Sequence, residues 1–150
     1  MSLKETLQAD LNTAIKSRNS VVAETIRMVL TAITNEEVAG KEKKELSDAE
    51  IITVLTREAK KRREAAEAFD AGGRADRAAT ERAEGEVIAG YLPEQLSESE
   101  INNLISETIS AVGASGPSDM GKVMGALKAK VAGKADGALV SSLVKAALNK

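Results

Sequence analysis

The sequence predicts an all-α protein, and two observations carry that prediction. Apolar residues make up 43% of the 150 residues but aromatic residues only 1%, with Phe69 and Tyr91 as the whole supply. Cores of Leu, Ile, Val, Ala and Met favour helices, whereas sheets draw on aromatic and β-branched side chains. Apolar residues also recur at spacings of three and four, and no segment alternates long enough to form a strand.

Four helices are expected ahead of Pro93, a residue that cannot continue a helix. Ser2 and Ser47 each stand three residues before a glutamate, which is the capping-box pattern at a helix start. Ser20 is the expected cap of the helix between them. The four segments start at Ser2, Ser20, Ser47 and about residue 76, and the last three end near Gly40, Gly72 and Tyr91.

Three more helices are expected after Pro93. Ser97 with Glu100 forms a third capping box, and that helix closes at Gly113. Ser118 or Asp119 is the expected cap of the next helix, and Asp136 of the last. The apolar faces of these two helices are Met120, Val123, Leu127 and Val131, then Leu139, Val140, Leu143, Val144 and Ala147.

The boundary between the two groups falls in YLPEQLS (91–97). We therefore expect a four-helix N-terminal subdomain, residues 1–92, and a three-helix C-terminal subdomain, residues 93–150.

Several classes of function are made improbable by residues that the chain lacks. It has no cysteine, which excludes disulfides, thiolate metal sites and a cysteine nucleophile. It has no histidine, the commonest general base and metal ligand. We expect no metal and no cofactor. The start, MSLKETLQ, lacks the apolar run of a signal peptide, and no run of about 18 apolar residues occurs, so a cytoplasmic protein without a membrane segment is expected.

Charge is unevenly distributed, although the net charge is only −2. Between Pro93 and Gly121 there are four glutamates, one aspartate and no basic residue. The remaining segment has six lysines against Asp136 alone. These lysines are Lys122, Lys128, Lys130, Lys134, Lys145 and Lys150.

Two short motifs imitate catalytic signatures. GPSDMGKVMG (116–125) has the G-x-x-x-x-G-K spacing of a P-loop, but Val123 replaces the metal-binding hydroxyl and the preceding segment is helical. Asp119 would also place a carboxylate in the phosphate cradle. Ser142 and Lys145 fit S-x-x-K, a pair that any amphipathic helix can produce. We interpret the first motif as a helix start and the second as coincidence.

Gly121 and Gly125 lie four residues apart inside a predicted helix, where each glycine costs about 0.5–1 kcal/mol relative to alanine. Two explanations stay open. Another helix of the same bundle could pack against the glycines, or an RNA or protein backbone could rest on this small-residue face, held by the neighbouring lysines.

A second basic run, KKRR at 60–63, is neutralised by its surroundings. Glu58, Glu64 and Glu67 stand four residues from Arg62, Lys60 and Arg63 respectively. This spacing favours a self-paired helix face over a nucleic-acid patch.

The stretches YLPEQLSESEI (91–101) and DMGKVMGALKAKVAGKADGALVSSLVKAAL (119–148) closely resemble the YqeY family. Their C-terminal pattern is shared with the tail of the GatB subunit of glutamine-dependent aminoacyl-tRNA amidotransferases. TIRMVLTAITNEEV (25–38) is similar to the family's arginine–methionine and asparagine–glutamate signature. The resemblance covers essentially the whole chain and departs at Ala129, where the family pattern often has proline, so it does not fix where that helix ends.

The resemblance implies an all-helical, two-part protein with a GatB/YqeY-type C-terminal subdomain. The GatB tail contacts tRNA near the outer corner of the L, while the amidotransferase chemistry resides in other GatB domains and in the partner amidase subunit. The resemblance thus also implies a carbon–nitrogen ligase with glutamine as amide donor. No nucleophile with a base, ATP site or metal cluster can be identified in the residues to support that activity.

Three hypotheses follow. The first is a translation-related, non-catalytic module that binds tRNA or a tRNA-handling protein, with backbone donors at 118–121 adding to the side chains. Its candidate contacts are Lys122, Lys128, Lys130, Lys134, Gly121 and Gly125. The second is an accessory subunit of an amidotransferase-like enzyme, and the third a protein–protein adaptor. The lysines could equally be an ordinary solvated face, and the sequence does not indicate the oligomeric state.

Overall fold

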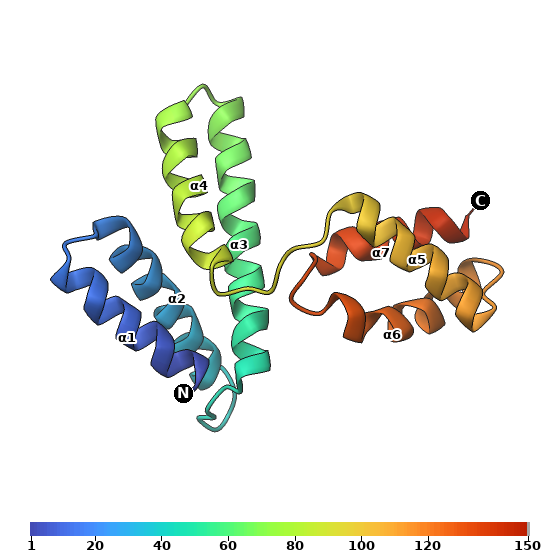
Figure 1. The fold of residues 1–150 in the computed structure, drawn as a ribbon, viewed down its shortest axis with the longest axis horizontal. Helices are drawn as coiled ribbons and strands as arrows, with labels where there is room; N and C mark the ends of the chain where they lie inside the picture. Colours follow the sequence, from blue (N-terminus) through green and yellow to red (C-terminus); the bar gives the residue numbers. More distant parts are fainter. Residues whose placement is uncertain (150) are drawn as a thin grey trace. The chain divides into compact units, whose positions relative to one another are not determined.

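The computed structural model describes residues 1–149, and within them it contains only helices and connecting loops (Figure 1). The all-α prediction is confirmed. The helices are α1 (Leu3–Lys16), α2 (Ser20–Val38), α3 (Asp48–Ala71), α4 (Ala75–Ala89), α5 (Glu98–Val112), α6 (Met120–Val131) and α7 (Gly137–Leu148), with a 3₁₀ turn, η1 (Pro117–Asp119), before α6. The chain forms two compact units, Met1–Leu92 and Pro93–Lys150.

Most of the helix starts are as the sequence predicts. Ser2 and Ser47 each form a complete capping box. Ser97 accepts a hydrogen bond from the backbone N–H of Glu100, but its hydroxyl also donates to the Glu100 side chain, so the third box lacks its reciprocal half. The cap of α2 is Asn19 and not Ser20, since the Asn19 side chain accepts from the N–H of Val22.

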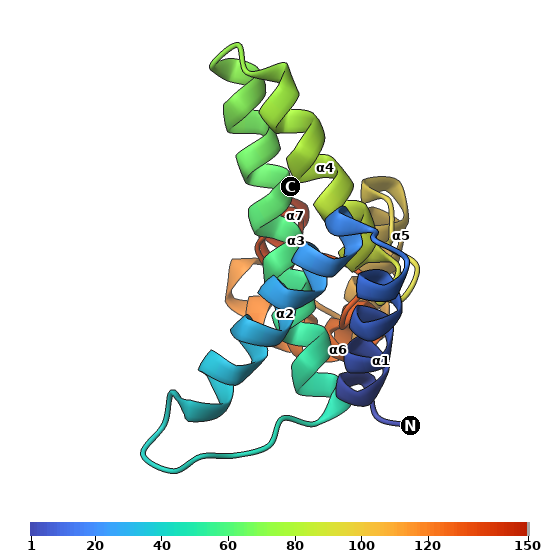
Figure 2. The ribbon, with the colours of Figure 1, turned by 90° about the vertical axis from the view of Figure 1, so that its left-hand side faces the viewer.

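In the N-terminal unit, α1 pairs with α2 and α3 pairs with α4, as the two ribbon views show (Figures 1 and 2). Burying apolar side chains from all four helices is the main driving force for this unit. The core consists of Leu7, Leu11, Ala14, Ala23, Ile26, Val29, Ile33, Leu46, Ile51, Val54, Leu55 and Ile88.

The buried carboxylate of Glu37 fastens α1 and the α2–α3 loop to the end of α2. The Glu37 side chain is 3% exposed as a residue, pairs with Lys4 at 2.8 Å and accepts from the backbone N–H of Leu46. The hydrogen bond from Lys4, followed by that from Leu46, holds the pKa of the Glu37 carboxyl below its usual value. This carboxylate is therefore ionised at neutral pH and fixes the loop beside Leu46, which is itself buried in the core.

A second polar anchor joins α3 to α4. The Arg62 guanidinium lies 3.4 Å from carboxylate oxygens of both Glu81 and Glu84 and also contacts the sulfur of Met28. All three charged side chains are less than 20% exposed. Such a cluster stabilises the hairpin only while both signs of charge are present, because an unpaired buried charge is costly.

The C-terminal unit is a three-helix arrangement around an apolar core. Its buried residues come from α5, α6 and α7 at helical spacing, which explains the prediction of three amphipathic helices. They are Ile101, Ile105, Val123, Leu127, Val131, Val140, Val144 and Leu148. Gly113 ends α5 with φ at 68°, a conformation that glycine adopts without strain.

Candidate nucleic-acid interface

The candidate site lies on the exposed side of α6, opposite the face that packs into the core. Val123, Leu127 and Val131 are buried and Met124 packs beside them, so the opposite side of the helix faces solvent. Gly121, Gly125 and Ala129 follow one another at intervals of four residues along that side and are all exposed. The helix continues through Ala129 and ends at Val131. Alanine in place of the family's frequent proline therefore does not end the helix at this position.

The glycines of α6 do not support helix packing within the unit. A Cβ atom built on Gly121 or on Gly125 would meet nothing within 4 Å in the described part of the chain. The first explanation offered by the sequence, close packing of a neighbouring helix of the bundle, is therefore wrong for both positions. The two glycines therefore leave an open strip of backbone on α6, and each of them makes the helix less stable than alanine would.

Two of the four candidate lysines flank this strip. With about 100° per residue, Lys122 and Lys128 stand roughly 60° to either side of Gly125 around the helix axis. Both are exposed. Within residues 1–149 neither forms an ion pair, although Lys122 is near enough to the Asp119 carboxylate to lower its pKa.

The other two candidate lysines stand apart from the strip. Lys130 is about 140° from Gly125 around the axis, near the edge of the buried face. Lys134 lies beyond α6, in the turn before α7. The structure thus groups Lys122 and Lys128 with the glycines, and leaves Lys130 and Lys134 at the margin.

The start of α6 differs from the expected cap. Ser118 is inside the 3₁₀ turn, and Asp119 stands at the cap position without making a capping hydrogen bond. Its carboxylate instead accepts from the backbone N–H of Ser115 at 2.9 Å and from the Ser115 hydroxyl at 3.4 Å. Ser115, in the turn before α6, therefore takes the Asp119 carboxylate that would otherwise cap the helix.

This arrangement bears on the P-loop resemblance. The backbone hydrogen bond from Ser115, with a smaller contribution from Lys122, holds the pKa of Asp119 below its usual value. An ionised carboxylate at the cap position of α6 repels a phosphate bound by the backbone N–H groups of the helix start, as a P-loop requires. The segment before the glycines is α5 with its loop and not a strand, so the interpretation of 116–125 as a helix start agrees with the structure.

A contact that sequence reasoning missed fixes the turn carrying Lys134. The amide nitrogen of Gln95 lies 2.8 Å from the carbonyl oxygens of both Pro93 and Gly133, and donates to each. The backbone N–H of Leu96 donates to the carbonyl of Lys134 at 2.8 Å. The segment LPEQLS therefore binds the α6–α7 turn. In the sequence, only the resemblance of this segment to the family marked it as important.

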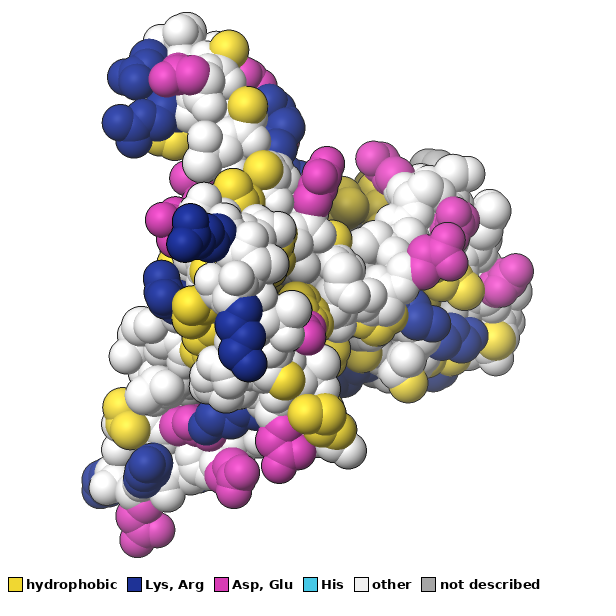
Figure 3. All heavy atoms as spheres, turned by 60° about the vertical axis from the view of Figure 1, so that its left-hand side comes forward, with side chains coloured by type: hydrophobic (Ala, Val, Ile, Leu, Met, Phe, Trp, Pro, Cys, Tyr) yellow, Lys and Arg dark blue, Asp and Glu magenta, His cyan; other side chains and the backbone are white. Residues whose placement is uncertain are grey.

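The remaining sequence candidates are less suited to binding a ligand. In the basic run of α3, Lys61 pairs with Glu58 at 3.1 Å and Lys60 with Glu64 at 4.0 Å. Arg62 turns to α4 and not to Glu58 as the spacing suggested. Figure 3 shows basic and acidic side chains interspersed over the face of the N-terminal unit that it draws. Ser142 and Lys145 are both exposed on α7, and no hydrogen bond joins them among residues 1–149.

Residues 1–149 hold no group of three or more aspartates and glutamates placed to bind a metal ion. Within the same range, every helix is too short or too polar to cross a bilayer.

Comparison with known proteins identifies the family. The model of the family described as Yqey-like protein matches residues 4–148. A similar protein, 30% identical over 132 residues, is the altered inheritance of mitochondria protein 41, mitochondrial, of Pyrenophora tritici-repentis, with 86% of this chain and 71% of that relative aligned. The name places that relative in mitochondria, so a cytoplasmic location for this chain stays a prediction. The match over nearly the entire length shows that the chain belongs to the YqeY family.

Proposed function

We propose that the C-terminal unit contacts the sugar-phosphate backbone of a folded RNA through the exposed side of α6, with tRNA as the first candidate. The observation that carries the proposal is the open strip of Gly121 and Gly125 with Lys122 and Lys128 on its two edges. Without a Cβ, the helix backbone can be approached closely, and an ammonium group on each side can meet a phosphate.

The chemistry favours recognition of the backbone over recognition of bases. Stacking on unpaired bases requires aromatic side chains, and the two in this chain, Phe69 and Tyr91, belong to the N-terminal unit. Folded RNA is bound largely through its shape, phosphates and 2′-hydroxyls. A narrow strip bordered by lysines suits such contacts, with Lys130 and Lys134 available to a larger ligand.

In this proposal the protein is a tRNA-associated module without its own catalytic step. The family resemblance brings with it a carbon–nitrogen ligase activity that uses glutamine as amide donor. A chain without cysteine and histidine has no thiol nucleophile and no imidazole base for that reaction. A role in presenting tRNA to another subunit remains compatible with the same surface.

The test is binding of total tRNA to the full chain at several salt concentrations. Each phosphate neutralised contributes about −0.9 to the slope of log affinity against log salt on duplex DNA and about −0.7 on single strands, and folded RNA is expected to fall in this range. If Lys122, Lys128, Lys130 and Lys134 all contribute, we expect a slope near −3 to −4. The variant Lys122→Ala with Lys128→Ala should lose about half of that slope and most of the affinity.

The matched control is Lys60→Ala with Lys61→Ala, which removes the same charge from the paired run of α3. We expect the control to bind tRNA almost as the native chain does. Equal losses in both double variants would show nonspecific charge attraction and contradict the proposal. If the native chain does not bind tRNA, the proposed RNA contact is wrong.

The alternative from the sequence, a protein–protein adaptor, uses the same glycine strip to dock a partner helix. Small residues permit close approach of two helices. The salt dependence separates the two, since apolar helix docking at this strip would be nearly insensitive to salt whereas RNA binding must weaken with it.

A further inference from the structure

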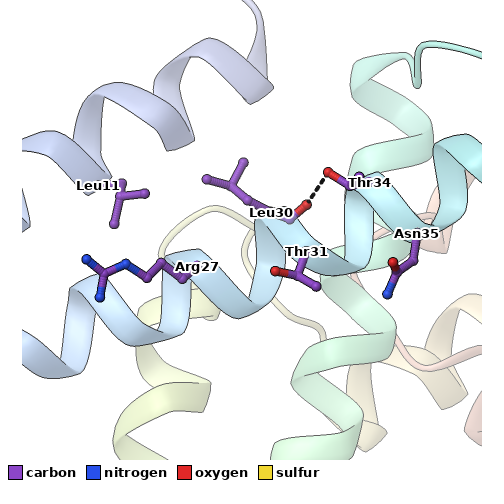
Figure 4. Close-up of a pocket in the computed structure, with 6 residues that line it drawn as sticks. All are labelled: Leu11, Arg27, Leu30, Thr31, Thr34 and Asn35. Atoms are coloured by element: carbon purple, nitrogen blue, oxygen red, sulfur yellow. Dashed lines mark hydrogen bonds between the residues drawn. The ribbon is translucent and has the colours of Figure 1, made fainter.

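The N-terminal unit has a surface hollow that the proposed RNA contact does not involve. It lies between α1 and α2, has a volume of about 420 Å³ and opens to solvent. Figure 4 shows Leu11 pointing from α1 toward α2, where the Arg27 side chain lies along the helix. The lining residues are Leu11, Arg27, Leu30, Thr31, Thr34 and Asn35.

The floor of the hollow is apolar and extends beyond it in both directions. Ile15 follows Leu11 by one helical turn on α1, and Val38 follows Thr34 by one turn on α2. Their exposed fractions are 47% and 53%, which is high for large aliphatic side chains. By this spacing, Ile15 and Val38 extend the apolar lining of Leu11 and Leu30 at opposite ends of the hollow, although Leu11 itself is only 8% exposed.

The polar side chains of the hollow form few hydrogen bonds or ion pairs within the protein, so they can bind a ligand. Arg27, Thr31 and Asn35 are exposed at successive intervals of four residues on α2. Within residues 1–149, Arg27 forms no ion pair. The Thr34 hydroxyl donates to the carbonyl of Leu30 at 3.0 Å, so its oxygen is still able to accept.

These features fit one class of occupant. An open groove between two helices does not enclose a small molecule, which normally buries most of its surface in its site. Its shape instead suits a third helix laid along the pair, with apolar residues one turn apart. Arg27 is the one cation that lines the hollow, so it calls for one carboxylate on the docked helix, whereas RNA would also meet the exposed Glu24, one turn before Arg27 on α2.

We propose that the α1–α2 groove is the docking site for an amphipathic helix of a partner protein, with an acidic side chain of that helix paired to Arg27. The apolar side of the partner helix covers Leu11, Ile15, Leu30 and Val38. The hydroxyl and amide groups of Thr31, Thr34 and Asn35 form the polar rim of the contact.

The probe for a test is a displayed library of amphipathic helical peptides of about 18 residues, or five turns. It is selected for binding to the full native chain. We expect the enriched peptides to share apolar residues one turn apart and an aspartate or glutamate at one fixed position. A synthetic consensus peptide should lose about ten-fold or more of its affinity for Arg27→Glu, as measured by fluorescence anisotropy.

Two further measurements make the result specific to the groove. Replacing the acidic residue of the peptide by lysine should restore binding to Arg27→Glu and weaken binding to the native chain. The variant Arg63→Glu is the charge-matched control, because Arg63 is exposed on α3, and it should bind the consensus peptide as the native chain does. Thr31→Tyr, at an exposed helix position, fills the hollow without changing charge and should also weaken binding.

Three outcomes would overturn the proposal. They are a library without enrichment over an unrelated helical protein, enriched peptides without an acidic preference, and an Arg27→Glu effect no larger than that of Arg63→Glu. Displacement of the consensus peptide by tRNA would assign the groove to nucleic acid, which also contradicts a helix-docking site. Circular dichroism of each variant checks that the fold is retained.

Discussion

The two units of the chain use their charged side chains in opposite ways. In the N-terminal unit, Arg62, Glu81 and Glu84 pair in a partly buried cluster, and Glu37 binds Lys4 and the N–H of Leu46. In the C-terminal unit, the lysines on α6 extend into solvent without an ion-pair partner among residues 1–149.

The difference separates charges that determine the fold from charges that are available to a ligand. A buried, paired charge fixes the position of its helix but offers little field to the outside, because its partner cancels it. An exposed, unpaired lysine adds almost nothing to stability and keeps its attraction for anions, subject to screening by salt. The first prediction below tests the paired charges of the N-terminal unit, and the second tests the glycine strip beside the unpaired lysines of the C-terminal unit.

Removing Arg62 should have the largest effect on stability. The change Arg62→Met keeps much of the side-chain volume but leaves Glu81 and Glu84 facing each other without a cation. We expect the free energy of unfolding of the N-terminal unit to fall by about 3 kcal/mol. Urea unfolding followed by the fluorescence of Tyr91, the only tyrosine of the chain, measures it.

The neighbouring change Arg63→Met is the control, since Arg63 is exposed and should cost less than about 0.5 kcal/mol. Adding Glu81→Gln and Glu84→Gln to Arg62→Met should recover part of the loss by removing the unpaired charges. If Arg62→Met and Arg63→Met are equally stable, the cluster does not hold the hairpin.

The glycines of α6 give the second prediction, with the opposite sign. Because a Cβ at Gly121 or Gly125 meets no neighbour, the double change to alanine should stabilise the C-terminal unit by about 1–2 kcal/mol. Amide hydrogen exchange in α5, α6 and α7 reports it, since this unit has no aromatic residue. The bulkier Gly125→Leu should retain the gain in stability but weaken tRNA binding by blocking the strip.

Ala126→Gly is the matched control, because Ala126 is also exposed on α6 and should lose about 1 kcal/mol. A destabilised Gly121→Ala, Gly125→Ala variant would mean that the strip is packed in solution. That result would argue against a ligand surface on α6.

Local features of the fold could be predicted from the sequence, whereas contacts between distant segments could not. The helix starts at Ser2 and Ser47 depend on four-residue motifs, and both capping boxes are present. The start of α2 was placed one residue late, since Asn19 and Ser20 are both good caps and only the geometry decides between them. Asp119 was misjudged because Ser115 competes for its carboxylate.

The candidate site was only partly visible in the sequence. Helical spacing alone places Lys122 and Lys128 beside Gly125, but whether another helix covers the glycines depends on packing that no spacing rule reveals. The same holds for Arg62, whose partners lie about twenty residues away on α4. The groove at Arg27 could not be found without knowing which face of α2 meets α1.

The smallest of the three effects concerns Tyr91, which ties the end of the N-terminal unit to α1. Its phenol O–H donates to the carboxylate of Asp10 at 2.6 Å. Burial, followed by this hydrogen bond, raises the pKa of Tyr91 above its ordinary value. The folded state therefore retains the proton after the unfolded chain has lost it, near pH 10. The stabilisation is complete below that pH and is lost as the pH rises further.

We expect Tyr91→Phe to lower the free energy of unfolding at neutral pH by about 1 kcal/mol, the usual net value of one hydrogen bond. Above about pH 10, the native chain should lose stability faster than the variant, because only the native chain has this phenol to titrate. Urea unfolding followed by far-ultraviolet circular dichroism between about pH 8 and pH 11 compares the two slopes. Parallel slopes would show that the phenol does not couple α1 to the end of α4.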